Sequence, residues 1–217
     1  MSPIRLIIFD LDGTLIDSLD DLTCATNHML TTLGRPSVDQ GQVRSLVGQG
    51  ARRLVERALP GAVPAEIDRG LELFLRYNEE HVAVHTDCYP GVIDTLTELQ
   101  SRGTVMTVVS NKNELLCRKV LELLGLEVFL SGIYGADSLP ERKPSPLPLL
   151  HVMRMFDVAA GETLMVGDSI NDIAAGIGAG VPTVGCRYGY GAPDELRDAT
   201  WQVNVLTQLL TLPPFKR

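Results

Sequence analysis

The sequence predicts an α/β protein with a Rossmann-like parallel sheet and a small all-helical second domain. Three observations lead to this fold. The apolar run 6–9 ends directly in acidic residues, as a strand that is buried on both faces can do at its end. From residue 89 onward, apolar runs alternate with segments of helical periodicity, which is the pattern of a parallel sheet. Between these parts, residues 17–85 have helical periodicity and no convincing strand.

The first strand leads into Asp10-Leu11-Asp12-Gly13-Thr14. Side chains alternate faces along a strand, so Asp10 and Asp12 are expected on one side while Leu11 points away. Two like charges held together favour a metal ion beside them. A simpler interpretation stays open here, because Asp12-Gly13 between apolar runs is also a strong signal for a hairpin turn.

The segment 16–86 is expected to form a compact helical insert. Apolar residues recur at helical spacing in four stretches that end at glycine or proline. Ser37 and the residues up to Gln40 are typical of a capping box at the start of the second helix. The four helices are expected near 18–33, 37–47, 51–59 and 64–82.

After Tyr89-Pro90-Gly91, helices and strands alternate. Pro146 suits the first position of a helix, where a missing N–H does no harm. The expected strands are 105–109, 132–134, 163–166, 182–184 and 202–205. The expected helices are 92–103, 113–124, one from 145, an Ala/Gly-rich one after 169, and a closing helix over 206–212.

Polar side chains that could take part in catalysis or in metal binding follow four of the expected strands. They are Asp10 and Asp12, Ser110 and Asn111, Asp168, and Lys143. Sites in parallel sheets lie beyond the carboxyl ends of the strands, so these groups are expected to converge on one crevice. The helical insert leaves the core directly after the first of them, and we expect it to cover the crevice as a lid.

Composition narrows the classes of function. The chain has 217 residues and a net charge of −8, which argues against nucleic acid or an anionic membrane as the main partner. The four cysteines lack CxxC spacing, which favours free thiols in a reducing compartment. No run approaches the ~18 apolar residues of a membrane span, and no early segment has the layout of a signal peptide. We therefore expect a soluble, cytoplasmic protein.

Four motifs together resemble those of the haloacid dehalogenase-like hydrolase superfamily, in order and spacing. They are Asp10-Leu11-Asp12-Gly13-Thr14, Ser110-Asn111-Lys112, Lys143-Pro144 and Gly167-Asp168-Ser169-x-x-Asp172. The resemblance spans 4–186 and implies a HAD-like core over 1–15 and 87–217 with a C1-type helical cap over 16–86. Further stretches resemble the bacterial phosphoglycolate phosphatases within that superfamily: Val47-Gly48-Gln49-Gly50-Ala51, Tyr89-Pro90-Gly91-Val92, 179–185 and Tyr188-Gly189-Tyr190.

The resemblance implies a Mg²⁺-dependent phosphatase. Asp10 would be the nucleophile that forms an aspartyl-phosphate, and Asp12 the general acid and base. The implied metal ligands are the side chains of Asp10 and Asp168 and the backbone carbonyl of Asp12. A carboxylate and a phosphate charge ~4 Å apart repel by roughly 4 kcal/mol at an effective dielectric near 20, and Mg²⁺ would offset that repulsion.

The remaining motif residues would surround the phosphate. The resemblance gives Ser110 and the backbone N–H of Asn111 contacts to its oxygens, and gives Lys143 the role of neutralising its charge. Asp172 and Thr14 would support the inner residues from behind. Each pattern alone has a plainer interpretation: Ser-Asn is a common helix cap, most lysines are solvated, and Asp168 and Asp172 suit a helix cap and an exposed helix position.

Substrate selection is expected from the insert. Gly48, Gln49 and Gly50 are flexible enough to approach a ligand closely. Arg52 and Arg53 are candidates for binding the carboxylate of a small phospho-acid, because arginine matches carboxylates bidentately. Arg187 is a comparable candidate, and exposed helix arginines are an equally good interpretation.

The expected activity is hydrolysis of a small phosphate monoester, foremost 2-phosphoglycolate to glycolate and phosphate. A pyrophosphatase, another sugar or nucleotide phosphatase and a phosphomutase remain open within the enzyme class. A phosphoryl-accepting signalling domain is the alternative from a different class, although such domains are about half as long and lack the insert. The expected partner is a small phosphorylated metabolite, without nucleic acid or membrane, and the expected state is a monomer or homodimer.

Overall fold

The computed structural model describes residues 3–215. Its main sheet has six strands in the order β5-β4-β1-β6-β7-β8, and each neighbouring pair is parallel. All their carboxyl ends therefore lie at one edge, which confirms the expected α/β fold. The strands are β1 (Leu6–Phe9), β4 (Val105–Val109), β5 (Gly132–Tyr134), β6 (Thr163–Gly167), β7 (Thr183–Cys186) and β8 (Trp201–Val203).

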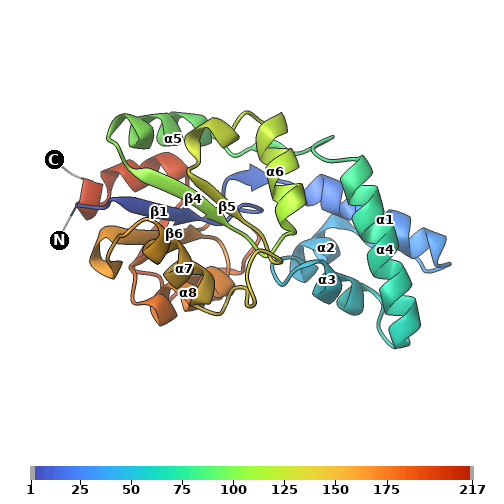
Figure 1. Cartoon of the computed structure of the whole chain (residues 1–217). Helices are drawn as coiled ribbons and strands as arrows, with labels where there is room; N and C mark the ends of the chain where they lie inside the picture. Colours follow the sequence, from blue (N-terminus) through green and yellow to red (C-terminus); the bar gives the residue numbers. More distant parts are fainter. Residues whose placement is uncertain (1–2, 216–217) are drawn as a thin grey trace.

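Both faces of the sheet are covered because both sides of its central strand are apolar. In β1, Ile7 and Phe9 pack into one core layer and Leu6 and Ile8 into the other, all fully buried. Helices α5 and α6 cover the first face, and α7 and α8 cover the second (Figure 1). These helices are α5 (Val92–Ser101), α6 (Glu114–Leu123), α7 (Leu147–Met155) and α8 (Ile170–Ala179).

The hairpin interpretation of Asp12-Gly13 is excluded. Both neighbours of β1 are parallel strands that return from later in the chain. The chain instead closes a tight loop after β1, in which Gly13 has φ +86° and its N–H donates to the carbonyl of Ile16. A two-residue strand, β2 (Ile16–Asp17), then pairs antiparallel with β3 (Asp87–Cys88), a pair too short to be detected by periodicity.

The segment between β2 and β3 folds as four helices with their own core. They lie beyond the carboxyl ends of the sheet strands (Figure 1), and Leu22, Met29, Val55 and Phe74 are among the buried residues of a separate apolar cluster. The β2–β3 pair joins the two parts where the chain leaves and returns. The division into 1–15 with 87–217 and 16–86 stays a prediction. The helices are α1 (Leu19–Thr32), α2 (Gln40–Leu46), α3 (Ala51–Ala58) and α4 (Pro64–Glu80).

Some expected boundaries differ from the structure. The capping box of α2 is made by Asp39 and Gln42, whose side chains each accept a hydrogen bond from the other's backbone N–H, so α2 begins later than Ser37 suggested. The closing segment is a 3-10 helix, Leu206–Thr211. It ends there because Leu212 precedes a proline and takes an extended conformation. Within residues 3–215, no helix combines the length and apolarity needed to cross a membrane.

Candidate active site

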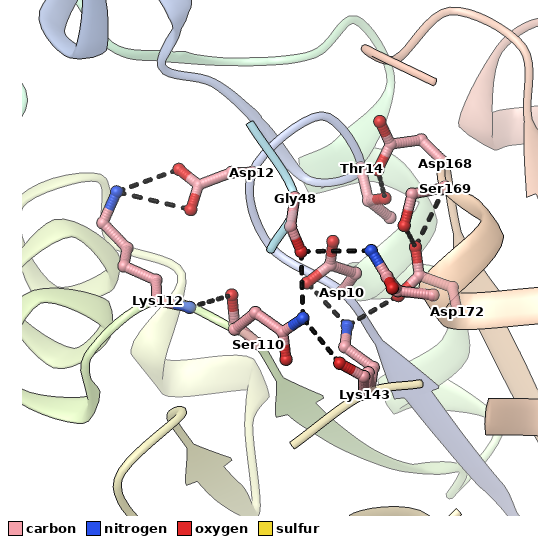
Figure 2. A network of polar contacts seen from close by, with 12 residues as sticks. Asp10, Asp12, Thr14, Gly48, Ser110, Lys112, Lys143, Asp168, Ser169 and Asp172 are labelled. Atoms are coloured by element: carbon pink, nitrogen blue, oxygen red, sulfur yellow. Dashed lines mark hydrogen bonds and ion pairs between the residues drawn. The ribbon is translucent and has the colours of Figure 1, made fainter. Parts of the chain in front are cut away.

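Polar side chains from four strand ends meet at the carboxyl edge of the sheet (Figure 2). Asp10 follows β1 directly and its N–H continues the ladder to Val166, at 2.8 Å. Ser110 follows β4, Asp168 follows β6, and Lys143 lies in the loop after β5. The convergence expected from the parallel topology is therefore present in the structure.

Three carboxylates form a buried acidic cluster at this edge. Asp10, Asp168 and Asp172 each offer an oxygen, and these oxygens all lie within 4.8 Å of one another. Burial raises the pKa of Asp10 to about 7, against the opposing effect of Lys143. Burial and the neighbouring Asp10 also raise the pKa of Asp168 well above its ordinary value. A cation would relieve this repulsion, and oxygen donors are what Mg²⁺ prefers.

Lys143 lies within this cluster. Its Nζ is 2.8 Å from Asp10 Oδ1 and 2.6 Å from Asp172 Oδ1, and the residue is almost fully buried. Burial alone would lower the pKa of Lys143, but the two carboxylates outweigh that effect and hold the pKa above its ordinary value. The interpretation of Lys143 as a solvated surface lysine is excluded.

Asp168 and Asp172 are held in fixed orientations. Asp168 accepts hydrogen bonds from Thr14 Oγ1 at 3.1 Å and from the backbone N–H groups of Tyr190 and Gly191. Asp172 is fully buried and its Oδ2 accepts from both the backbone N–H and the hydroxyl of Ser169. Ser169, not Asp168, is the N-cap of α8, so both plainer interpretations of these acids are excluded.

Asp12 lies apart from the acidic cluster. Its carboxylate contacts Lys112 Nζ at 3.0 and 3.3 Å and accepts a hydrogen bond from Ser18 Oγ at 2.5 Å. Figure 2 shows this side chain pointing toward Lys112 and away from Asp168. Asp10 and Asp12 nevertheless line the same two clefts, so the two side chains lie on one side as expected, although their carboxylates have different partners.

Ser110 and Asn111 form the loop after β4. Both are buried, and Ser110 Oγ accepts a hydrogen bond from the backbone N–H of Lys112 at 3.2 Å. The Asn111 amide donates to the backbone carbonyls of Gly48 and Lys143, at 2.9 Å each. The N-cap of α6 is Asn113, so neither Ser110 nor Asn111 is a helix cap.

Residues 48–50 of the insert, here called the glycine loop, contact the core domain. The carbonyl of Gly48 accepts hydrogen bonds from Asn111 and from Asn171 Nδ2, the latter at 3.2 Å. Gly48 and Gly50 have φ +104° and +83°, a region that favours glycine. A Cβ added at Gly50 would meet the carbonyl oxygen of Asn111 at 3.1 Å. The glycine loop therefore lies against the residues of the site, and its approach to a ligand stays a prediction.

Two clefts open on either side of the Gly48 contact. The first, here called the ester cleft, contains Ser110, Lys112 and Lys143 on its core wall. The second contains Asp168, Gln49 and Arg44. Asp10, Asp12 and Gly48 line both, so the acidic cluster is reached from either side.

The three arginines proposed for substrate binding are not brought into these clefts. Arg52 is exposed and pairs with Asp68 at 2.6 Å, and Arg53 is exposed and pairs with Glu56 at 2.8 Å. Arg187 is exposed and lines neither cleft. All three are therefore exposed arginines, as the alternative interpretation of the sequence expected.

Four residues that the sequence interpretation left without a role take part in the site. Two are Lys112 and Ser18, which contact Asp12. Another is Asn171, which contacts Gly48. The hydroxyl of Tyr190 accepts from the backbone N–H of Ser18 at 2.6 Å while its own N–H donates to Asp168. Lys112 and Tyr190 lie inside the sequence motifs on which the family resemblance rests, and these motifs were the only signal in the sequence that pointed to the two residues.

The fold and the site define the class of this protein as an α/β enzyme with a buried acidic cluster, a lysine and a hydroxyl group at the carboxyl ends of parallel strands. Residues 7–186 match the model of the family described as haloacid dehalogenase-like hydrolase. The chain belongs to this family, and it is a hydrolase. The superfamily expected from the four motifs is confirmed.

Named relatives agree with this assignment. The chain is 42% identical to a phosphoglycolate phosphatase of Chromobacterium violaceum, with 96% of each sequence covered. It is also 42% identical to a phosphoglycolate phosphatase of Neisseria gonorrhoeae, covering 87% of this chain and 82% of the relative. A crystal structure described as a predicted phosphoglycolate phosphatase from Haemophilus somnus superposes with a TM-score of 0.93 at 32% identity, covering 97% of this chain and 98% of that one.

Proposed function

We propose that this hydrolase is a Mg²⁺-dependent phosphatase that converts 2-phosphoglycolate to glycolate and phosphate. The observation that carries the proposal is the meeting of Asp10, Lys143 and Ser110 beside an acidic cluster, in a cleft that the glycine loop partly covers. The relatives of about 40% identity named phosphoglycolate phosphatase support the choice of ester.

Asp10 is the proposed nucleophile. Its Oδ1 contacts Lys143 at 2.8 Å, which leaves the second oxygen free of that ion pair to attack phosphorus. The attack forms an aspartyl-phosphate and expels the alkoxide of glycolate, and water then hydrolyses the acyl phosphate. Lys143 orients Asp10 and neutralises charge on the phosphoryl group, while Ser110 Oγ and the Asn111 N–H donate to its oxygens.

Asp12 is the proposed general acid and base. It gives a proton to the leaving alkoxide and takes one from the attacking water. The hydroxyl of Ser18, at 2.5 Å, and the ammonium of Lys112, at 3.0 Å, fix its carboxylate in the cleft. Asp12 and Asp10 thus have different partners, and each carboxylate can take a separate role.

The acidic cluster is the proposed site of Mg²⁺. The fit rests on three carboxylates, two of them buried, whose oxygens lie within 4.8 Å of one another. Asp10 and Asp168 would hold the ion by their side chains, and Asp12 would hold it by its backbone carbonyl. Asp172, whose carboxylate is fixed by hydrogen bonds from Ser169, would support these ligands from behind. When bound, the ion would offset the repulsion between the phosphate and Asp10 and orient the phosphate.

A panel of phosphate esters assayed with and without Mg²⁺ tests the proposal. We expect turnover that needs Mg²⁺ and a kcat/KM for 2-phosphoglycolate at least about tenfold above those for sugar phosphates, a difference of about 1.4 kcal/mol. The variant Asp10→Asn should abolish turnover of every ester and prevent trapping of the aspartyl-phosphate. A flat profile across the panel would contradict the named substrate, and turnover by Asp10→Asn would contradict the mechanism.

A further inference from the structure

The two walls of the ester cleft differ in polarity. The insert contributes apolar side chains such as Leu54 and Phe74, and among the residues that the structure describes, Asn78 is its one polar side chain in this cleft. The core wall carries the charges. The cations that line the ester cleft within residues 3–215 are Lys112 and Lys143. A carboxylate on the substrate must therefore meet a core lysine here, not a cap arginine.

The ammonium groups of the two lysines differ in their burial and in the number of carboxylates that they contact. The side chain of Lys143 is 1% exposed and lies between Asp10 and Asp172. The side chain of Lys112 is 12% exposed, and the described part of the chain gives its Nζ one partner, Asp12. An ammonium group has three donors, and the two oxygens of Asp12 occupy at most two. Lys112 therefore has a donor left for a ligand in the cleft.

The position of Lys112 matches the far end of the proposed substrate. Asp12 must contact the oxygen that leaves phosphorus, and Lys112 Nζ lies 3.0 Å from Asp12 Oδ1. In 2-phosphoglycolate a single methylene group separates that oxygen from the carboxylate. A substrate whose phosphate is at Ser110 and Lys143 therefore places its carboxylate near Lys112.

The arginines of the second cleft are less suitable. Arg44 donates to the backbone carbonyls of Tyr190 and Gly189, and Arg57 donates to the carbonyl of Ser45 at 2.6 Å. Neither lines the ester cleft, where Ser110 and Lys143 lie.

We propose that Lys112 is the specificity-determining residue of the ester cleft and binds the substrate carboxylate, sharing its ammonium group between that carboxylate and Asp12. The proposal rests on the function proposed above and deepens it. Lys112 then selects short phosphate esters that carry an anionic group one methylene away from the ester oxygen.

Two esters with the same carbon count test this proposal. 2-Phosphoglycolate and ethyl phosphate differ in having a carboxylate or a methyl group beside the same methylene. We expect wild-type enzyme to prefer 2-phosphoglycolate, and Lys112→Met to lower kcat/KM for it by about 10- to 100-fold more than for ethyl phosphate, because a hydrogen bond to a charged group is lost. Most of the difference between the two esters should lie in KM, whereas any loss of kcat through Asp12 should be common to both, and Lys112→Arg should restore part of the preference.

The matched control is Lys119→Met on α6, the helix that follows Lys112, because the ammonium of Lys119 pairs with Glu79 outside the cleft. Thermal unfolding and the remaining turnover of ethyl phosphate establish that each variant is folded. Equal losses on both esters in Lys112→Met would show that Lys112 only positions Asp12, and would overturn the inference while leaving the proposed function standing. A wild-type enzyme with no preference between the esters would overturn the proposed substrate and the inference together.

Discussion

The side chain of Asn111 donates a hydrogen bond to the backbone carbonyl of Gly48, 2.9 Å away. One residue belongs to the loop after a central strand, and the other to the glycine loop of the helical insert. A second amide, from Asn171, reaches the same carbonyl at 3.2 Å. The glycine loop is thus held to the core by two side chains, one from the loop after β4 and one from the first turn of α8.

We expect Asn171→Ala to loosen this contact. One hydrogen bond is lost, which contributes about 0.5–1.5 kcal/mol, so KM should rise roughly two- to tenfold while kcat changes less. Amide hydrogen exchange of 48–50 should become faster, since the loop separates from the core more often. Asn27→Ala is the matched control, because Asn27 bonds Val38 inside the insert. Unchanged exchange at 48–50 in Asn171→Ala would contradict this role.

Gly13 is expected to tolerate no side chain. Its φ is +86° and a Cβ there would lie 2.3 Å from Asp168 Oδ2. Gly13→Ala should therefore displace Asp168, lower kcat/KM by at least about 100-fold (about 2.7 kcal/mol) and destabilise the fold by more than the ~1–2 kcal/mol that a left-handed residue costs. Gly34→Ala isolates that backbone cost, because Gly34 has φ +70° and open space around it. Equal effects of the two substitutions on activity would refute the proposed crowding of Asp168.

The positions of Asp10, Ser110, Asp168 and Lys143 could be predicted from sequence because parallel topology fixes them. Each follows an apolar strand, and the carboxyl ends of parallel strands share one edge. The short β2–β3 pair could not be predicted, since two residues carry no periodicity.

The arginines show a different limit of sequence interpretation. Arg52 and Arg53 are near the glycine loop in sequence, yet they face solvent and form ion pairs within the insert. Which face of α3 points outward depends on packing of Leu54 and Val55 against the insert core. The ion pair of Lys112 with Asp12 joins residues 100 positions apart, and no local pattern reports such a contact.

Binding of Mg²⁺ should stabilise the protein. An ion that binds only the folded state at 100 times its Kd adds about 2.7 kcal/mol to the free energy of unfolding, so the unfolding midpoint should rise as Mg²⁺ is added. Asp168→Asn should lose most of this rise, because it removes a charge from the acidic cluster. Asp198→Asn, at an exposed acid outside the cluster, should keep the full rise. A Mg²⁺-dependent rise of the same size in Asp168→Asn would argue against the proposed metal site.

The metal-free protein should become less stable as pH rises through the range from about 4 to 7. The pKa of Asp10 is raised from 3.8 to about 7 by burial, with Lys143 opposing. Between these values the unfolded chain has released the Asp10 proton while the folded chain still holds it. The free energy of unfolding therefore falls with increasing pH, by at most about 4 kcal/mol for this group. Denaturant unfolding in a chelator at several pH values measures the slope, and Asp10→Asn should flatten it. Stability that rises across this range in wild type, or an unchanged slope in Asp10→Asn, would place the source of the pH dependence outside Asp10.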